Sequence, residues 1–266
     1  MVNRLTSFLL CVACCLSGIE TQVAIQQSSQ TGRNNWEIDP AFLDEAFVFV
    51  RLRTRHHGNW RTDYPDSDLN FLFRMHEMTS LQVNPDPVVL EASDRRILEY
   101  PFIYMIDPRD RGQDWYLEND EIAVLRDYLN PGGFIMVDDF WGDETWENIR
   151  RQLKRLLPGR EPEELSLSHP IFNIVFNIRE KPQVPSIERA LEGRDQGITW
   201  EGSPRNVPRY WGVSDDRGRL MMLICQNTDL GDGWEREGDS RWYFEEFSQK
   251  RAYPMGLNIL FYVMTH

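Results

Sequence analysis

The sequence predicts an α/β fold in which a mostly parallel, mixed β-sheet is flanked by helices. Short apolar runs alternate with segments of helical periodicity over most of the chain. A late pair of apolar runs is joined by a turn, which adds an antiparallel hairpin to the sheet. The length of 266 residues suits one such domain preceded by a short N-terminal extension. Strand–helix alternation implies parallel strands with helices on both faces of the sheet.

The first half of the domain supplies three of the predicted strands. Residues 46–53 form an apolar run that passes into an alternating Arg-Leu-Arg pattern, as in a mostly buried strand. Asp66 or Ser67 is suited to cap a helix that follows. Two more short apolar runs, residues 87–90 and 101–106, predict the next strands.

The second half continues the alternation and then changes character. The spacing predicts a helix over 119–130, a strand over 134–137 and a helix that begins at Asp143. Residues 160–208 are rich in Pro, Gly and charge, which predicts loops with short strands. We expect a hairpin over residues 210–225 and a final helix from Pro254.

The charge of the chain excludes some classes of partner. Asp and Glu number 42 against 29 Lys and Arg, which gives a formal net charge of −13. Non-specific nucleic-acid binding and docking on an anionic membrane surface both require a basic face. We therefore expect no nucleic-acid partner and a protein that works in an aqueous compartment.

The N-terminus has the pattern of a secretory leader. Arg4 precedes the apolar run 5–16, which is too short to span a bilayer as a helix. We predict a signal peptide over residues 1–19, a flexible linker over 20–40 that is rich in Gln, Ser and Thr, and an α/β domain over 41–266. The expected location is the periplasm or cell envelope, without a membrane span.

The cysteines bear on the same question. Cys11, Cys14 and Cys15 lie in the predicted leader, and only Cys225 lies in the domain, so an intradomain disulfide is excluded. Cys14 follows Val12 and Ala13 in a loose match to a lipoprotein processing site. A lipid anchor at Cys14 therefore stays open as an alternative to a soluble exported protein.

Polar residues follow three of the predicted strands, at the edge where open α/β sheets bind ligands. The candidate ligand-binding residues after the first strand are Arg51, Arg53, Trp60, Arg61, Asp63 and Tyr64. Asp138, Asp139 and Trp141 follow the predicted strand 134–137. The residues Asn227, Asp229, Asp232 and Trp234 follow the second strand of the predicted hairpin, which ends at residue 225. If these strands are parallel neighbours, we expect the three segments to share one cleft.

That composition suits a polar ligand such as a sugar. Tryptophan rings stack on apolar ring faces, and Asp, Asn and Arg side chains hydrogen-bond to hydroxyl groups. A structural interpretation stays open for each residue. Asp138 and Asp139 are suited to cap the next helix, Asp232-Gly233 is ordinary turn chemistry, and Arg–Asp pairs are often structural.

Signals for other chemistry are weak. The chain has no Gly-x-Ser-x-Gly elbow, and Cys225 lies within an apolar strand where a thiol is inert. His169-Pro170 follows a predicted loop, and we interpret it as a packing motif at the start of a strand. Asp229, Asp232 and Glu235 are oxygen ligands of the calcium type, but their spacing is not that of an EF-hand loop. We therefore expect no metal and no cofactor.

Several motifs together resemble one bacterial family. These are residues 49–53, 60–65, 132–140, 169–172, 227–234 and 253–258. They resemble the bacterial domain-of-unknown-function 4159 family over about residues 42–266. The resemblance implies a fold similar to class I glutamine amidotransferases, a flavodoxin-like three-layer sandwich. The amidotransferase nucleophile is a cysteine after a strand of this kind, but Asp138 stands at the matching position, so glutamine hydrolysis is not implied.

Two functional hypotheses follow. The first is a non-catalytic binding or scaffold domain of the cell envelope that holds a polar ligand or a partner protein. The second is a hydrolase-like enzyme with Asp138 or Asp139 as base or nucleophile. Carboxylates buried in a cleft would favour the enzyme, and carboxylates turned into a helix cap would favour the binding domain.

Overall fold

The computed structural model describes residues 34–56, 58–110, 113–201 and 207–266. The predicted signal peptide, Cys14 and most of the predicted linker lie outside the described residues. Asn34 and Trp36 fall at the end of the predicted linker and contact the domain. Asn34 donates to the carbonyl of Leu69 at 3.1 Å, and the indole of Trp36 donates to that of Val83 at 2.7 Å.

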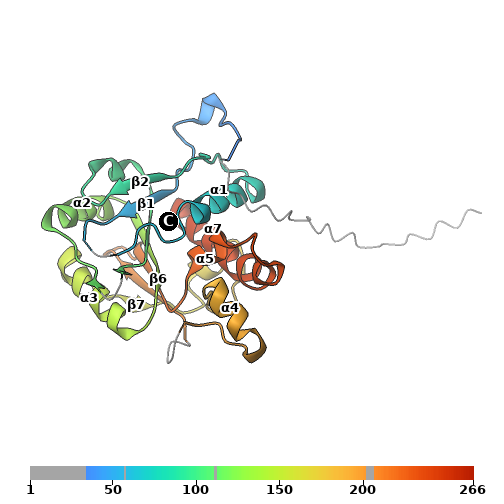
Figure 1. The fold of residues 1–266 in the computed structure, drawn as a ribbon. Coiled ribbons are helices and arrows are strands. Elements are labelled where there is room, and N and C mark those ends of the chain that lie inside the picture. The colour runs from blue at the N-terminus through green and yellow to red at the C-terminus, as the bar shows by residue number, and fades with distance from the viewer. Residues whose placement is uncertain (1–33, 57, 111–112, 202–206) are drawn as a thin grey trace, which may run out of the picture.

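The main sheet has seven strands in the order β2-β1-β3-β6-β9-β8-β7 (Figure 1). Its strands are β1 (Val50–Arg53), β2 (Val88–Glu91), β3 (Phe102–Ile106), β6 (Phe134–Phe140), β7 (Glu163–Glu164), β8 (Arg209–Ser214) and β9 (Leu220–Gln226). The neighbouring strands from β2 to β9 pair in parallel, β8 pairs antiparallel with β9, and β7 pairs antiparallel with β8. A separate antiparallel pair joins β4 (Arg109–Asp110) to β5 (Gln113–Asp114). The predicted mixed, mostly parallel sheet is confirmed.

Helices cover both faces of the sheet (Figure 1). They are α1 (Asp66–Met78), α2 (Asn119–Leu129), α3 (Asp143–Leu156), α4 (Ile187–Gly193), α5 (Leu230–Glu235), α6 (Arg241–Tyr243) and α7 (Tyr253–Thr265). Short 3-10 turns are η1 (Pro40–Phe42), η2 (Arg95–Glu99), η3 (Pro170–Phe172) and η4 (Arg194–Gln196), and η5 (Phe244–Ala252) is π-helical. No helix among these described segments is long and apolar enough to cross a membrane.

Two hydrophobic cores lie on opposite faces of the sheet. Phe71 of α1 and Leu257 of α7 pack in one core with Tyr104, and Ile149 of α3 packs in the other with Ile103. Adjacent strand residues thus point to different cores, as the two-residue period of a strand requires. The result is the three-layer α/β arrangement that the sequence predicts.

Most element boundaries follow the sequence signals. The helix α2 begins with a capping box in which Glu118 and Glu121 satisfy each other's backbone N–H groups. Gly142, with a φ of 86°, precedes α3. The last helix α7 begins within one residue of the predicted Pro254, but α6 and η5 precede it without a break from Arg241, which was not predicted. Pro254, which has no N–H to donate, lies at the junction where the π-helical η5 passes into α7.

Candidate functional site

The carboxyl end of β6 carries an adjacent pair of acids in an irregular piece of strand. The register between β6 and β9 shifts between Val137 and Phe140, so Asp138 and Asp139 lie in a bulge. Asp139 has a φ of 52°, in the left-handed region that most residues avoid. Bulges re-aim side chains beside functional sites. The two consecutive acids therefore do not have to follow the normal alternation of a strand.

Asp138 is completely buried, and one of its two carboxylate oxygens accepts three hydrogen bonds. Its Oδ2 accepts from the hydroxyl of Tyr104 at 3.1 Å and from the backbone N–H groups of Leu230 and Gly231 at 2.9 and 3.1 Å. Its Oδ1 is buried and has no hydrogen-bond partner. Burial raises the pKa of Asp138 to about 7, although these hydrogen bonds act in the opposite direction. Asp138 thus connects β6 to the first turn of α5 and does not cap α3, the next helix in the chain.

Arg51 on β1 organises the loop that follows the strand. Each of the five N–H groups of a guanidinium has an acceptor here: the carboxylate of Asp68, the hydroxyl of Ser67, and the carbonyls of Trp60 and Thr62 at 3.1 and 2.8 Å. Arg51 and Asp68 have fully buried side chains. Burial lowers the pKa of Arg51, but the charge of Asp68, the hydrogen bond to it and the nearby Tyr104 and Asp63 together raise the value above its usual one. Arg51, which the sequence predicted to bind a ligand, therefore has all its side-chain donors used by hydrogen bonds within the protein.

Asp63 is placed by that loop. The residue has a φ of 61°, and its Oδ2 is buried without a hydrogen-bond partner. Gly231 allows the approach, because a Cβ at that position would lie 2.5 Å from Asp63 Oδ2 and 2.7 Å from the hydroxyl of Tyr104. Burial, together with the charges of Asp232 and Asp139, raises the pKa of Asp63 well above its usual value. Asp63 therefore lies against the start of α5.

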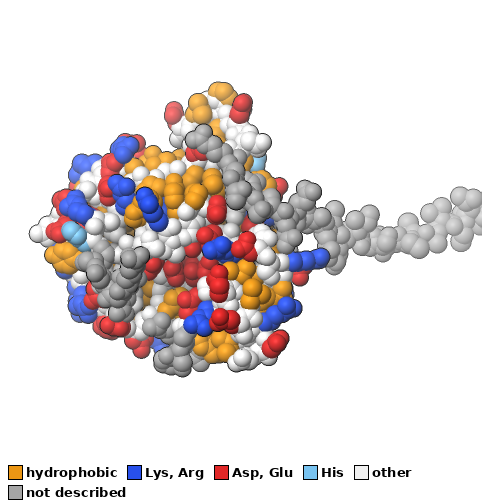
Figure 2. Space-filling view, in the orientation of Figure 1, with side chains coloured by type: hydrophobic (Ala, Val, Ile, Leu, Met, Phe, Trp, Pro, Cys, Tyr) orange, Lys and Arg blue, Asp and Glu red, His pale blue; other side chains and the backbone are white. Residues whose placement is uncertain are grey.

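The helix α5 completes a group of acids. Asp229 accepts a hydrogen bond from the backbone N–H of Asp232 at 2.8 Å and so caps the helix. Carboxylate oxygens of Asp63, Asp232 and Glu235 lie within 4.8 Å of one another. We call the following residues the acidic cluster: Asp63, Asp138, Asp139, Asp229, Asp232 and Glu235. Figure 2 shows acidic side chains gathered near the middle of the face where Figure 1 places β6 and α5.

Like charges reinforce one another within the acidic cluster. Burial comes first in raising the pKa values of Asp139 and Asp229 well above their usual range, and neighbouring carboxylates raise them further. Burial and the charge of Glu235 raise the pKa of Asp232 to about 7. Burial also raises the pKa of Glu235. Such a group is stable only when protons or bound positive charge reduce the repulsion.

Backbone strain is concentrated at the same end of the sheet. Among the described residues, the non-glycine positions with positive φ are Asp63, Asp107, Asp139 and Asn227. Asp107, Asp139 and Asn227 lie in or directly after β3, β6 and β9, and Asp63 lies in the loop between β1 and α1. Strained backbone of this kind often accompanies functional sites, where the surrounding structure over-determines it.

Other predicted residues after β1 lie at the surface. Arg53 pairs with Glu91 on the neighbouring strand β2, with its Nε donating at 2.7 Å. Trp60 is half-buried, and the guanidinium carbons of Arg53 and Arg61 lie 5.7 and 5.0 Å from its ring centroid. Tyr64 is half-buried, 5.7 Å from the ring of Trp60. Arg61 itself is exposed.

Three further predicted ligand-binding residues do not lie on an open surface. Trp234 is 1% exposed and packs 4.4 Å from the ring of Phe71, and Trp141 is 8% exposed. Both indoles are therefore buried rather than available for stacking. Asn227 accepts from the N–H of Gly142 at 2.8 Å and donates to the carbonyl of Val207 at 2.8 Å, so it fastens neighbouring loops.

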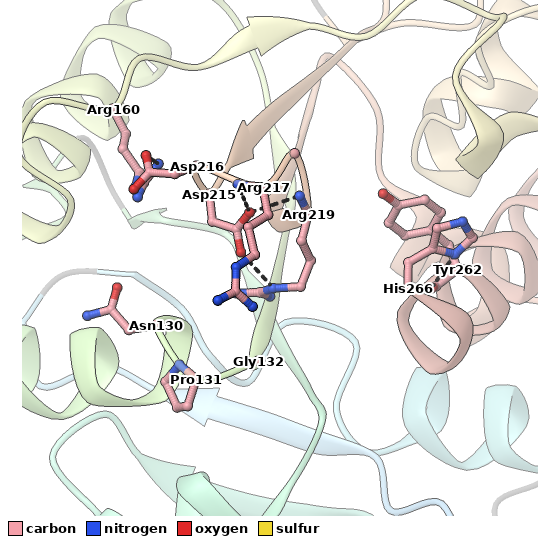
Figure 3. A pocket seen from close by; sticks show the side chains of 11 residues that line it. Asn130, Pro131, Gly132, Arg160, Asp215, Asp216, Arg217, Arg219, Tyr262 and His266 are labelled. Carbon is pink, nitrogen blue, oxygen red and sulfur yellow. Dashed lines mark hydrogen bonds and ion pairs between the residues drawn. The ribbon is translucent and has the colours of Figure 1, made fainter.

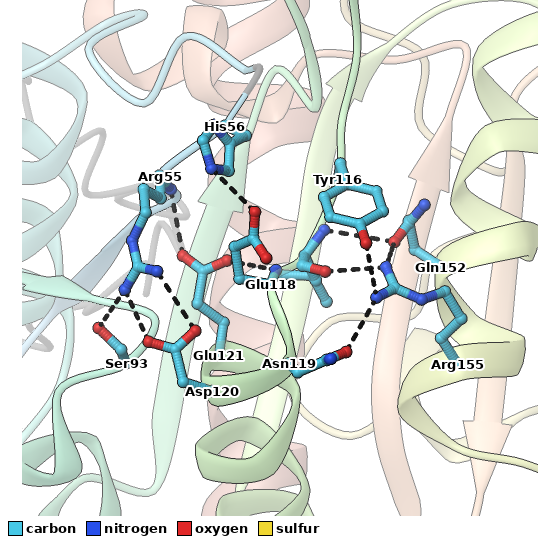
Figure 4. Close-up of polar contacts among 11 residues, drawn as sticks. Arg55, His56, Ser93, Tyr116, Glu118, Asn119, Asp120, Glu121, Gln152 and Arg155 are labelled. Carbon is cyan, nitrogen blue, oxygen red and sulfur yellow. Dashed lines mark hydrogen bonds and ion pairs between the residues drawn. The ribbon is translucent and has the colours of Figure 1, made fainter.

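Two of the described histidines, His56 and His169, have other partners. His56 pairs with Glu118 at 3.0 Å, in a surface network where Arg55 pairs with Asp120 (Figure 4). His169 accepts from the N–H of Ile171 at 3.2 Å, and its ring lies 5.4 Å from that of Tyr262.

A cavity of about 890 Å³ lies at the opposite, amino end of the strands (Figure 3). Two of its arginines, Arg160 and Arg219, are engaged with the protein. Arg160 donates to the carbonyl of Ser214 at 2.9 Å, and Arg219 donates to that of Leu129 at 2.7 Å and pairs with Asp215. Both arginines therefore have a structural role, because each joins neighbouring segments of the chain.

Sequence reasoning missed several parts of the site. Tyr104 and Gly231 were not singled out as site residues, although each contacts Asp138. Glu235 was considered only with Asp229 and Asp232, whereas its near neighbours are Asp63 and Asp232. The repeated spacing of three residues from Asp229 to Asp232 to Glu235 was the available signal, because a helix brings such residues to one side.

The comparisons with known proteins agree with the motifs. No curated protein matches the chain at a significant level. A family model described as a domain of unknown function, DUF4159, matches residues 48–264, which is most of the chain and nearly all of the α/β domain. The chain is a member of the domain-of-unknown-function 4159 family.

Proposed function

We propose that this domain is a non-catalytic binding domain whose acidic cluster holds a polar ligand that carries positive charge or several hydrogen-bond donors. The observation that carries the proposal is the buried, unpartnered Oδ2 of Asp63 among other carboxylates. A buried carboxylate oxygen without a partner is unfavourable unless a ligand supplies one.

The neighbouring cations do not fill this role. Arg51 directs its N–H groups to Asp68 and to uncharged acceptors. Arg236 pairs with Glu235 at 2.5 Å and with Asp239 at 3.4 Å, and it lies partly at the surface. The cluster thus keeps an excess of acceptors, which favours cationic or donor-rich ligands and disfavours phosphates and carboxylates.

A carbohydrate is a narrower form of the same proposal and has less support. Trp141 and Trp234 are buried, and arginines lie over the ring of Trp60. A sugar would therefore have to rely on hydrogen bonds to the acidic cluster rather than on stacking.

The test is a thermal-unfolding screen of the purified chain with a diamine, a neutral disaccharide and a dicarboxylate. A ligand that binds only the native state raises the melting temperature. We expect a shift with the diamine or the disaccharide and none with the dicarboxylate. The shift should disappear in Asp232→Asn and persist in Asp239→Asn, an exposed control. A shift produced by the dicarboxylate alone would contradict the proposal.

A hydrolase-like enzyme that uses Asp139 is the second candidate. The left-handed backbone of Asp139 and its raised pKa are the observations that favour it. Asp138 is a weaker candidate because its Oδ2 is held by three donors. The test is a screen of the wild-type protein against hydrolase substrates. Turnover of a substrate by the wild type that is lost in a folded Asp139→Asn variant would support the enzyme over the binding domain.

We also propose that the protein is exported and acts in the cell envelope, on a scaffold related to class I glutamine amidotransferases. The leader pattern of residues 1–19 supports export. Intact-mass measurement of the protein from its native host tests this. A mass that lacks the leader is expected, an added lipid mass would indicate an anchor at Cys14, and a retained Met1 would refute export.

A further inference from the structure

Three side chains of the acidic cluster lie at the spacing that one metal ion requires. Carboxylate oxygens of Asp63, Asp232 and Glu235 are within 4.8 Å of one another. Calcium–oxygen bonds are roughly 2.3–2.6 Å long, so side-chain shifts of a few tenths of an ångström at most bring all three oxygens into contact with one calcium-sized ion. The three side chains come from the loop after β1 and from α5, and they converge without any change in the backbone.

An independent observation points to a ligand at the same place. The Oδ2 of Asp63 is buried and has no hydrogen-bond donor. The fully buried Asp138, which contacts the N–H of Gly231 on the same helix, also has one oxygen without a partner. Buried acceptors are nearly always satisfied in folded proteins. A bound ion would complete the environment of Asp63 directly.

The donor set selects the kind of ion. Every ligand atom is a carboxylate oxygen, and no His or Cys belongs to the group. Hard cations prefer such oxygens, whereas zinc favours nitrogen and sulfur ligands. We infer that Asp63, Asp232 and Glu235 together bind one hard divalent cation of the calcium or magnesium type. The inference rests on the proposed binding function, since it names the ligand class of the same cluster.

The competing explanation is that the carboxyl groups share protons and need no ion. Paired carboxyls remain close when one of them is protonated, as in proteins with coupled acid pairs. The two explanations differ in their response to added cation. They also differ in the effect of replacing one carboxylate by an amide of the same shape.

The experiment is a calorimetric titration of the full chain, first treated with a chelator, with CaCl₂ and with MgCl₂ separately. We expect saturable binding of one ion, and the two salts decide between calcium and magnesium. Asp63→Asn and Asp232→Asn should each weaken binding by roughly tenfold or more, because even indirect partners of metal ligands have effects of that size. Asp239→Asn removes an equal charge nearby and should leave the affinity unchanged.

A thermal-unfolding series guards against loss of folding in the variants. The Asn variants lack one buried like charge, so without cation they should melt no lower than the wild-type protein. Cation should raise the melting temperature of the wild type and of Asp239→Asn only. Glu235→Gln, whose side chain is 15% exposed, serves as a further variant should either Asn variant unfold.

The outcomes separate this inference from the proposed function. Absence of saturable binding, or equal affinity in the wild type and in both Asn variants, would overturn the cation site. If cations have no effect but a diamine or disaccharide gives a shift that depends on Asp232, the cation site is wrong and the binding function stands. If neither class of ligand gives such a shift, both proposals are wrong.

Discussion

Two buried charged groups lie beside each other at the carboxyl end of the sheet, and only one of them is internally balanced. Around Arg51, every donor has an acceptor and the buried charge of Asp68 has its counter-ion. In the acidic cluster, Asp63 and Asp138 each keep a buried oxygen without a partner. The two groups are connected, because the loop carbonyls held by Arg51 precede Asp63.

The comparison shows that burial of charge does not by itself identify a ligand site. A network such as that of Arg51, in which every hydrogen-bonding group has a partner, stabilises the fold and requires no ligand. An unsatisfied group of like charges requires another explanation, and a ligand is the simplest one. The predictions below test whether this division between a structural and a ligand-binding group is correct.

The largest expected effect is on the structural side. Arg51→Met leaves Asp68 buried without its partner, which should lower the free energy of unfolding by about 3–5 kcal/mol. Urea denaturation measures the loss. Arg53→Met is the matched control, since Arg53 pairs with Glu91 at the surface and should cost about 1 kcal/mol or less. Equal losses in the two variants would contradict the assignment of Arg51.

The next effect concerns the contact between α5 and the loop of Asp63. Gly231→Ala places a Cβ 2.5 Å from Asp63 Oδ2, which should cost about 1–3 kcal/mol despite the better helix propensity of alanine. The cost should shrink in an Asp63→Ala background, where that carboxylate is absent. A double-mutant cycle in chemical denaturation measures the coupling, and additive losses would show that the two residues do not meet.

A dependence of stability on pH follows from Asp138. Its pKa is about 7 in the folded protein and 3.8 in an unperturbed side chain, so the folded state binds more protons between these values. The free energy of unfolding should therefore fall as pH rises from about 4 to 7, by up to about 1.4 kcal/mol per pH unit for one proton. Denaturation in the presence of chelator measures this slope. Asp138→Asn should make the slope shallower by up to this one-proton amount, while Asp232, whose pKa is also raised to about 7, keeps part of it. A slope identical to that of the wild type would assign the whole effect to the other carboxyls.

The smallest expected effect is at the exposed rim. Arg61→Ala should change the free energy of unfolding by no more than about 0.5 kcal/mol, because Arg61 is exposed. It should also leave cation affinity unchanged. A large loss of affinity would extend the ligand site outward to Arg61 and Trp60.

The sequence predicted the layers of the fold and the edge at which the acids gather. Apolar runs ending in Asp138 and in Asn227 were sufficient, since parallel strands bring their carboxyl ends to one side. The strand order agrees with this, as β6 and β9 are parallel neighbours and β1 is separated from β6 by β3 alone.

The direction of individual side chains was not predictable in the same way. Arg51 and Arg53 look equivalent in the sequence, but α1 brings Asp68 against one face of β1 only. Trp234 follows a strand like a rim residue, yet the turn into α5 directs it into the core beside Phe71. Both outcomes depend on which helix covers which face, which local patterns do not specify.

The most direct test of the account is diffraction from crystals grown with manganese(II), which replaces magnesium or calcium at oxygen sites and scatters anomalously. We predict an anomalous peak within bonding distance of Asp63, Asp232 and Glu235, with the Oδ2 of Asp63 among its ligands. Crystals that bind manganese elsewhere, or that show these carboxyl oxygens in direct hydrogen bonds to one another with no peak between them, would contradict it.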